Sequence, residues 1–180
     1  GHLRLGGMNA PLTAAQTASA AAQDDVDIQH YFLALEFIPA TRRVTGSVTV
    51  TGKSLVNGFQ HLVLDLMANM TVTAVRRSGV NLLSTRPGNL LDITLDQPFD
   101  VGQTFIVQVV YNGIPDATGF GSISWTKYGS GTTATMVSTL SEPDGAKTWW
   151  PCKDRPDDKA TVDEWWTVPS AWTATGNGLL

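Results

Sequence analysis

The amino-acid sequence predicts an all-β fold, an antiparallel sandwich of two sheets with a saddle-like shape. Apolar and polar residues alternate with a period of two along several segments, which is the pattern of strands that bury one face. Turn-forming residues separate these segments at intervals of roughly 8 to 15 residues. No long segment after residue 25 has the periodicity of an amphipathic helix. Together these observations favour two packed β-sheets.

The first 24 residues are predicted to lie outside the folded domain, which we expect to span residues 25–180. Residues 1–7, before Met8, look like the remnant of an expression tag. Residues 9–23 are mostly Ala, Thr, Ser and Gln, with too few bulky apolar side chains to offset the entropy lost on ordering. They are therefore expected to form a leader or linker, although Asn9 could instead cap a short Ala-rich helix over residues 12–22. Such a stretch also remains after a bacterial export signal is removed, which favours an exported protein (periplasmic, envelope-associated or secreted).

The strands of the predicted sandwich follow one another from residue 28. The clearest covers residues 44–51, where Val and Gly alternate with Thr and Ser. Further strands are expected over residues 28–37, 61–66, 70–75, 90–95 and 105–111. Turns are expected at Asn57-Gly58, Ser78-Gly79, Arg86-Pro87-Gly88-Asn89, Val101-Gly102 and Asn112-Gly113.

The composition changes in the last third of the chain. Residues 119–131 are rich in Gly, Ser and Thr and predict a loop or irregular hairpin around Trp125 and Tyr128, followed by a strand over residues 136–140. Residues 141–160 combine charge, three prolines and two tryptophans without any period, so we expect a long, packed, irregular loop. Such loops inside compact domains are usually functional or interfacial.

The end of the chain predicts two more strands, over residues 160–168 and 171–175. Asn177-Gly178 is a strong hairpin signal, and after it only Leu179 and Leu180 remain. A hairpin turn without its return strand indicates a sequence taken from a longer protein, although a natural C-terminus could also end in a turn.

Charge and composition exclude several classes of function. Lys and Arg number 12 and Asp and Glu number 16, giving a formal net charge of −4. A strong attraction to nucleic acid or to an anionic membrane requires a concentrated positive field, which this balance does not favour. No apolar run approaches the roughly 18 to 20 residues that span a bilayer. Cys152 is the only cysteine, so no internal disulfide can form, and we expect it to be a buried structural thiol.

No catalytic motif is recognisable in this chain. None of the three histidines, His2, His30 and His61, is followed by Glu, so the zinc-binding His-Glu-x-x-His helix is not present. The serine-hydrolase Gly-x-Ser-x-Gly elbow and phosphate-binding loops are also missing, and Gly119-Phe120-Gly121 is only a fragment of one. We therefore predict no catalytic residue, no metal ligand and no cofactor within this chain.

Two groups of residues near the irregular loop have both a functional and a structural interpretation. Trp149-Trp150 and Trp165-Trp166 could stack on sugars, but neighbours on extended backbone point to opposite faces. One of each pair can thus fill the core while the other seals an interface, and we favour this interpretation. A charged cluster is expected to form a solvated loop fixed by ion pairs: Asp154, Arg155, Asp157, Asp158 and Lys159. Glu142, beside Pro143 at the mouth of the loop, would be another surface carboxylate.

The irregular loop contains a specific run of residues, Ser141-Glu142-Pro143-x-Gly145-Ala146-Lys147-x-Trp149-Trp150-Pro151-Cys152-x-Asp154-x-Pro156-x-x-Lys159-Ala160-Thr161. This run carries most of a likeness that spans residues 26–180, and with it the sequence resembles the aminopeptidase N family of zinc metallopeptidases, the gluzincin aminopeptidases. Asp154 to Ala160 fits the Asp-x-Pro-x-x-Lys-Ala signature of the family. Weaker matches are Val168-Pro169, Ala174-x-x-Asn177-Gly178, His30-Tyr31-x-Leu33-x-Leu35, Gly46, Leu64-Asp65-Leu66 and Tyr111-x-Gly113.

The resemblance implies the N-terminal, non-catalytic β-sandwich domain of an enzyme that removes N-terminal residues from peptides. In the family the next domain carries the zinc helix, so zinc and hydrolysis cannot be assigned to any residue here, and this chain alone should be inactive. The domain would pack against that metallopeptidase domain. One role does carry over: Glu142 matches the acidic or amide residue that helps to hold the free α-ammonium group of the substrate.

Two other interpretations remain open at the level of sequence. One is a stand-alone carbohydrate- or protein-binding β-sandwich, with Trp125, Trp149 and Trp172 as exposed platforms. The other is a scaffold whose gene has lost the catalytic half. Glycan titration would distinguish the first interpretation, and the reading frame beyond Leu180 the second.

Overall fold

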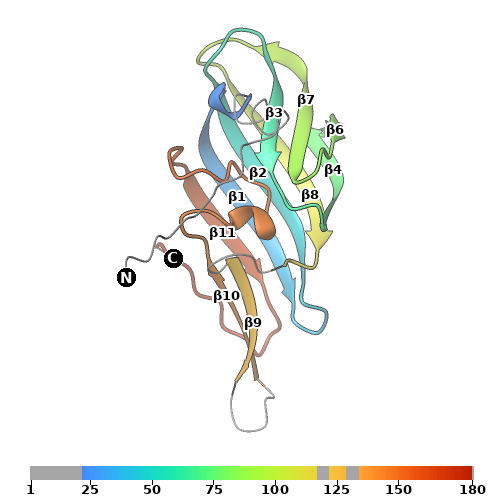
Figure 1. Ribbon diagram of the computed structural model, residues 1–180, viewed down its shortest axis with the longest axis vertical. Coiled ribbons are helices and arrows are strands. Elements are labelled where there is room, and N and C mark those ends of the chain that lie inside the picture. The colour runs from blue at the N-terminus through green and yellow to red at the C-terminus, as the bar shows by residue number, and fades with distance from the viewer. Residues whose placement is uncertain (1–21, 117–121, 129–133, 180) are drawn as a thin grey trace, which may run out of the picture.

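The computed structural model describes residues 22–116, 122–128 and 134–179, and regular structure in these ranges is almost entirely β-strand (Figure 1). The predicted all-β fold class is thereby confirmed. Most of the predicted leader and the Gly119-Phe120-Gly121 fragment lie outside the described residues. Within the described ranges, no helix is long and apolar enough to cross a membrane.

Three sheets make up the fold in the part of the chain that the structure describes. The largest has the strand order β11-β1-β2-β8-β4-β5, the second has the order β3-β7-β6, and the third pairs β10 with β9. The strands of the large sheet are Thr161–Thr167 (β11), Val26–Ile38 (β1), Arg43–Ser54 (β2), Thr104–Gly113 (β8), Met70–Arg77 (β4) and Val80–Asn81 (β5). The other two sheets consist of Phe59–Asp65 (β3), Leu90–Phe99 (β7), Leu83–Thr85 (β6), Ala134–Leu140 (β10) and Ser122–Tyr128 (β9).

The core lies between the large sheet and the β3-β7-β6 sheet, which covers one of its faces (Figure 1). Alternate side chains of each strand point into this space, as the period of two predicts. The apolar residues that meet there are almost fully buried and include Leu33, Leu35, Val48, Val50, Leu62, Leu64, Leu91, Ile93, Val107 and Val109. The opposite face of the large sheet carries Thr45, Ser47, Thr49 and Thr51 of β2, which are partly exposed.

Four of the five predicted turns are confirmed by glycines in the left-handed region of backbone space. Gly58, Gly79, Gly88 and Gly102 have φ angles of 72°, 82°, 66° and 84°. The turn predicted at Asn112-Gly113 is wrong, because both residues lie in β8. A Cβ at Gly113 would stand 2.5 Å from Met70 Sδ, so this glycine allows close strand packing and does not form a turn.

The pairing of the last strand differs from the antiparallel pattern expected for the sandwich. Strand β11 confirms the strand predicted over residues 160–168, but it pairs with β1 in parallel, with Ala34 opposite Trp165. Parallel pairing requires a long crossover connection, and here β1 and β11 are separated by nearly the whole domain. Strand β11 forms one edge of the large sheet.

Two predictions on the C-terminal side require correction. Residues 122–128 form a strand that pairs antiparallel with β10, so of the predicted loop or irregular hairpin around Trp125 and Tyr128 the hairpin pairing holds, but it is regular. Residues 171–175 form no strand. They border a groove of about 1130 Å³ between β10 and β11, so their backbone lacks the neighbouring strand that a β-ladder requires.

Candidate substrate-anchoring loop

The irregular loop over residues 141–160 follows β10 and is fixed to the core by backbone pairing. Cys152 forms an isolated antiparallel bridge with Asp65 at the end of β3, with N···O distances of 2.7 and 3.1 Å. A single turn of 3₁₀-helix, Ala146–Thr148, precedes the bridge. Its Lys147 carbonyl accepts a hydrogen bond from the Met67 amide at 2.9 Å. The loop is thus packed, as its composition predicted.

The aromatic residues of the loop anchor it from inside. Trp149 and Trp150 are 6% and 9% exposed, so both tryptophans are buried. The prediction that one of them seals an interface is wrong, because both lie in the bend that follows the 3₁₀ turn and not on extended backbone, where side chains would alternate. The Tyr111 hydroxyl donates to the Trp149 carbonyl at 2.8 Å, and Tyr31 stacks edge-on against Trp150. Burial raises the pKa of both tyrosines well above its ordinary value.

Asp154 lies beneath the 3₁₀ turn and is not a solvated residue of a charged loop. Its side chain is 5% exposed. Its carboxylate accepts hydrogen bonds from the amides of Gly145, Ala146 and Lys147 at 2.9 to 3.4 Å. The Lys147 ammonium completes the shell at 3.1 Å. A carboxylate satisfied in this way fixes the backbone immediately after Glu142.

The charge of Lys147 is stabilised by two carboxylates. Its Nζ lies 3.1 Å from both Asp144 and Asp154. Burial alone would lower the pKa of Lys147, but hydrogen bonds and charge from these carboxylates outweigh burial and raise that pKa above its ordinary value. Lys147 therefore stays protonated at neutral pH.

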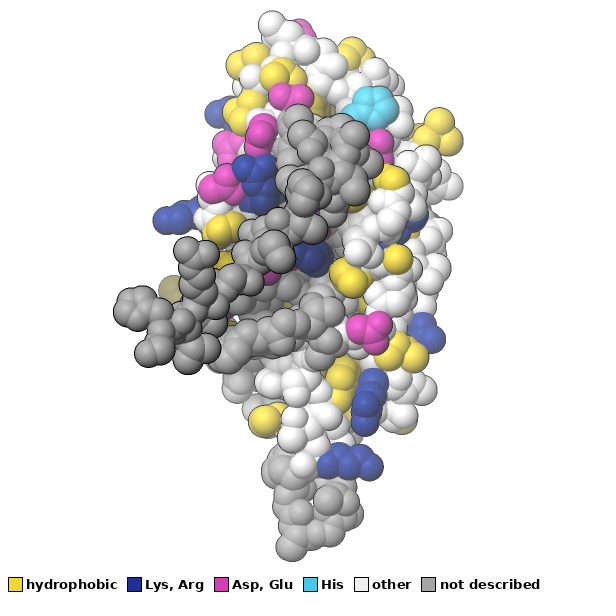
Figure 2. Space-filling view, viewed as in Figure 1, with side chains coloured by type: hydrophobic (Ala, Val, Ile, Leu, Met, Phe, Trp, Pro, Cys, Tyr) yellow, Lys and Arg dark blue, Asp and Glu magenta, His cyan; other side chains and the backbone are white. Residues whose placement is uncertain are grey.

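The other charged residues of the loop divide into an internal pair and a surface group. Lys153 and Asp158 are 7% and 10% exposed and lie 2.7 Å apart, so the prediction of a solvated loop is also wrong for Asp158. Lys153 Nζ also donates to the Val26 carbonyl at 2.8 Å, which ties the loop to β1. Arg155 pairs with Asp157 at the surface, as predicted, and also with Asp24, which the sequence placed in the leader. Figure 2 shows acidic and basic side chains intermixed on the visible face, without a patch of one sign.

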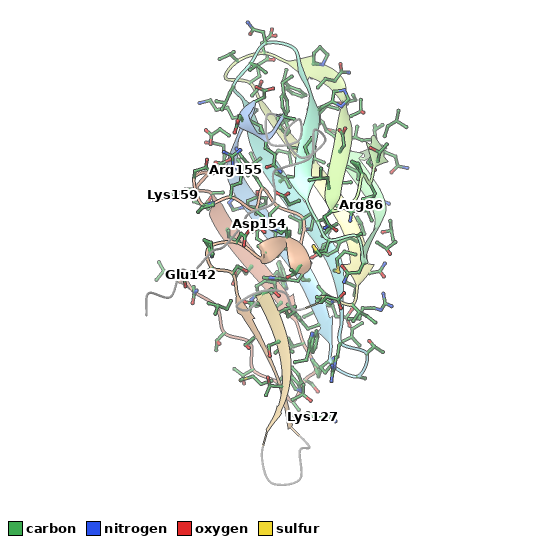
Figure 3. All side chains as sticks on the ribbon, viewed as in Figure 1. Arg86, Lys127, Glu142, Asp154, Arg155 and Lys159 are labelled. Carbon is green, nitrogen blue, oxygen red and sulfur yellow. The ribbon has the colours of Figure 1, made fainter. Side chains whose placement is uncertain are left out.

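Glu142 stands apart from this internal network. It is exposed, and among the described residues its carboxylate has no hydrogen-bond or ion-pair partner. A cis peptide bond links it to Pro143. Figure 3 shows Glu142 at the margin of the molecule and Asp154 nearer the middle, beside the 3₁₀ turn. Among the described residues Glu142 is thus an unpaired carboxylate, three residues before the backbone that Asp154 holds.

The described residues do not fit a zinc centre. His30 lies on β1 and His61 on β3, in two different sheets. No group of three or more His, Cys, Asp or Glu side chains in the described ranges could hold a metal ion. Cys152 is a free, buried thiol, and burial together with the nearby Asp154 charge raises its pKa well above the ordinary value. The Cys152 thiol therefore stays protonated at neutral pH.

The comparison that decides the family covers most of the chain. Residues 28–178 match the model of the family described as the peptidase M1 N-terminal domain. The chain belongs to this family. A direct comparison with curated protein sequences gives no significant match.

Solved structures of M1 zinc metallopeptidases share the fold. The one from Deinococcus radiodurans is 29% identical with a TM-score of 0.76, and the match covers 87% of this chain and 36% of that one. A mutant M1 zinc metallopeptidase from the same organism, bound to the substrate Tyr-Ser-Ala, is 30% identical with a TM-score of 0.75 and the same coverage. Yeast LTA4 hydrolase in complex with bestatin, at 23% identity and a TM-score of 0.65, shares the fold over 81% of this chain and 23% of that one. This chain therefore spans about a third of the length of the D. radiodurans structures.

Proposed function

We propose that this M1 N-terminal domain is the non-catalytic part of a zinc aminopeptidase. In this role it packs against the metallopeptidase domain and presents Glu142 to the amino terminus of the peptide substrate. The observation that carries the proposal is the free Glu142 carboxylate beside a backbone that Asp154 and Lys147 fix to the core. The zinc ion and its chemistry belong to the metallopeptidase domain, and for this chain alone we expect no peptidase activity.

The chemistry of the substrate terminus explains why an exposed carboxylate is useful. An α-ammonium group has three donors and a full charge, so in a cleft that excludes water it requires carboxylate acceptors at about 2.7 to 2.9 Å. A fixed acceptor sets the distance from the amino terminus to the first peptide bond. Because this distance is fixed, the peptide bond that reaches the reactive position is the one after the first residue. A substrate that is already positioned in this way needs no further ordering before it reacts.

The structure removes one part of the competing carbohydrate hypothesis. Trp149, one of its three proposed platforms, is 6% exposed and packs against Phe37 and Trp150. A sugar ring cannot stack on a side chain with so little accessible surface. The structure favours the aminopeptidase role, in which this tryptophan only supports the loop.

Substitution of Glu142 tests the proposed role in the protein joined to its metallopeptidase domain. For Glu142→Ala we expect kcat/KM on peptides with free amino termini to fall. The corresponding loss of transition-state stabilisation should be about 2 to 3 kcal/mol, the range for loss of a buried charge partner. Asp157→Asn is the matched control, because Asp157 is a surface carboxylate of the same loop. Steady-state kinetics in which Glu142→Ala behaves like this control would contradict the proposal.

A further inference from the structure

The outer face of the large sheet carries an exposed tryptophan that the aminopeptidase role does not use. Trp165 on β11 is 69% exposed, whereas its neighbour Trp166 packs against the core. The Trp165 ring meets Phe32 of β1 edge-on, with centroids 6.4 Å apart and an interplanar angle of 88°. One strand neighbour thus supports the indole from the side, and much of its surface remains open to a ligand.

A hollow lies beside this ring because the residue opposite it is small. Trp165 is in register with Ala34 on β1, and Glu36 is in register with Thr45 on β2. The hollow has a volume of about 300 Å³ and is bordered by Trp165, Ala34, Glu36, Thr45 and Thr167. It therefore combines an aromatic wall with a carboxylate and two hydroxyl groups.

Carboxylates flank the indole on both sides. Glu36 is exposed and, among the described residues, forms no ion pair or hydrogen bond. Asp163 is two residues before Trp165, so it lies on the same face of β11, and its side chain is 74% exposed. Its neighbour is His30, whose Nε2 is 3.7 Å from Asp163 Oδ2. Neither β11 nor β1 contains a lysine or arginine. On β2, Arg43 lies on the same face as Thr45, and its guanidinium donates a hydrogen bond to Asn112.

We propose that this hollow binds the arginine side chain of a polypeptide partner. A guanidinium ion is attracted to the face of an indole, and its planar donors match a carboxylate such as Glu36. The negative charge on both sides of the ring is complementary to a cation and gives no advantage to a neutral sugar. The inference is independent of the role of Glu142, which lies on the loop after β10.

Nuclear magnetic resonance of the ¹⁵N-labelled chain tests the proposal with a defined probe, Nα-acetyl-L-arginine methylamide. We expect saturable shifts of the Trp165 indole signal, with a dissociation constant on the order of 10 mM. Added salt should weaken the binding, because the groups are exposed. The corresponding citrulline derivative has nearly the same shape without the charge and should cause much smaller shifts.

Variants locate the site. Trp165→Ala should weaken binding at least about five-fold, followed by the backbone amide signals of β1 because this variant lacks the indole, and Glu36→Gln should weaken it about three-fold. Glu164→Gln is the control, because its side chain points to the other face of β11 and should leave the affinity unchanged. Equal responses to the arginine and citrulline probes, no saturation, equal losses in Glu36→Gln and Glu164→Gln, or a response to methyl α-glucoside alone would overturn the proposal.

Discussion

The position of Asp154 shows how a single charged residue can organise an irregular loop. In the sequence it belongs to a run of charged residues, and such runs usually face solvent. In the structure it accepts hydrogen bonds from three consecutive backbone amides, those of residues 145–147. The sequence pattern could not predict this, because the partners of a carboxylate depend on how the backbone of the loop turns. The resemblance to the aminopeptidase N family did single out Asp154, as part of a signature.

We expect Asp154→Ala to destabilise the domain strongly. The substitution leaves three amides without their acceptor and removes one of the two carboxylates that pair with Lys147, which costs about 3 kcal/mol. Urea denaturation measures the change, with the surface variant Asp157→Asn as a control that should unfold like the wild type. Equal unfolding midpoints for the wild type and Asp154→Ala would contradict the internal role of this carboxylate.

Cys152 predicts a specific loss of stability at alkaline pH. Burial raises its pKa in the folded state above the ordinary value of 9.0, so the unfolded chain loses this proton first as pH rises. The contribution of the buried, protonated thiol to the free energy of unfolding is complete below about pH 9 and decreases as pH rises toward the folded-state pKa. Between pH 8 and pH 10 the wild type should lose about 1.4 kcal/mol more than Cys152→Ala. Urea denaturation at both pH values measures the difference, and parallel losses would contradict burial of the thiol.

Among the elements, strand existence was more predictable than strand partnership. Alternation of apolar and polar residues correctly indicated the strands around residues 44–51 and 161–167, because this pattern depends only on residues within each segment. It could not indicate that β11 pairs in parallel with β1, since that choice depends on residues more than 100 positions apart. Residues 171–175 show the same limit, because their composition suits a strand but the described structure gives them no ladder partner.

Gly46 illustrates the close approach of two paired strands. It has φ 148°, and a Cβ there would stand 2.1 Å from the Ala34 carbonyl oxygen in β1. We expect Gly46→Ala to cost about 2 kcal/mol or more, because both strain and the backbone clash must be relieved. Gly79→Ala is the control: its φ is 82° but nothing lies near the added carbon, so only about 1 kcal/mol is expected. Thermal unfolding ranks the two, and the reverse order would contradict the close approach.

For the whole molecule, the fold class and the position of the loop could be predicted from the sequence, but the surfaces could not. Glu142 became a candidate through family resemblance, since nothing in its local pattern distinguishes it from other surface carboxylates. For Trp165-Trp166, alternation correctly predicted one ring against the core and one facing outward, but it could not reveal which face of the edge strand remains open. Which face of β11 remains open depends on which side of the large sheet is covered by the other sheets, and this is a property of the assembled sandwich.

The most direct test of the central claim is a crystal structure of the protein joined to its metallopeptidase domain, with a peptide substrate bound to an inactive variant. If Glu142 anchors the substrate, we expect one of its carboxylate oxygens within about 2.7 to 2.9 Å of the α-ammonium nitrogen of the peptide. An amino terminus held entirely by other residues, with Glu142 still facing solvent, would contradict it.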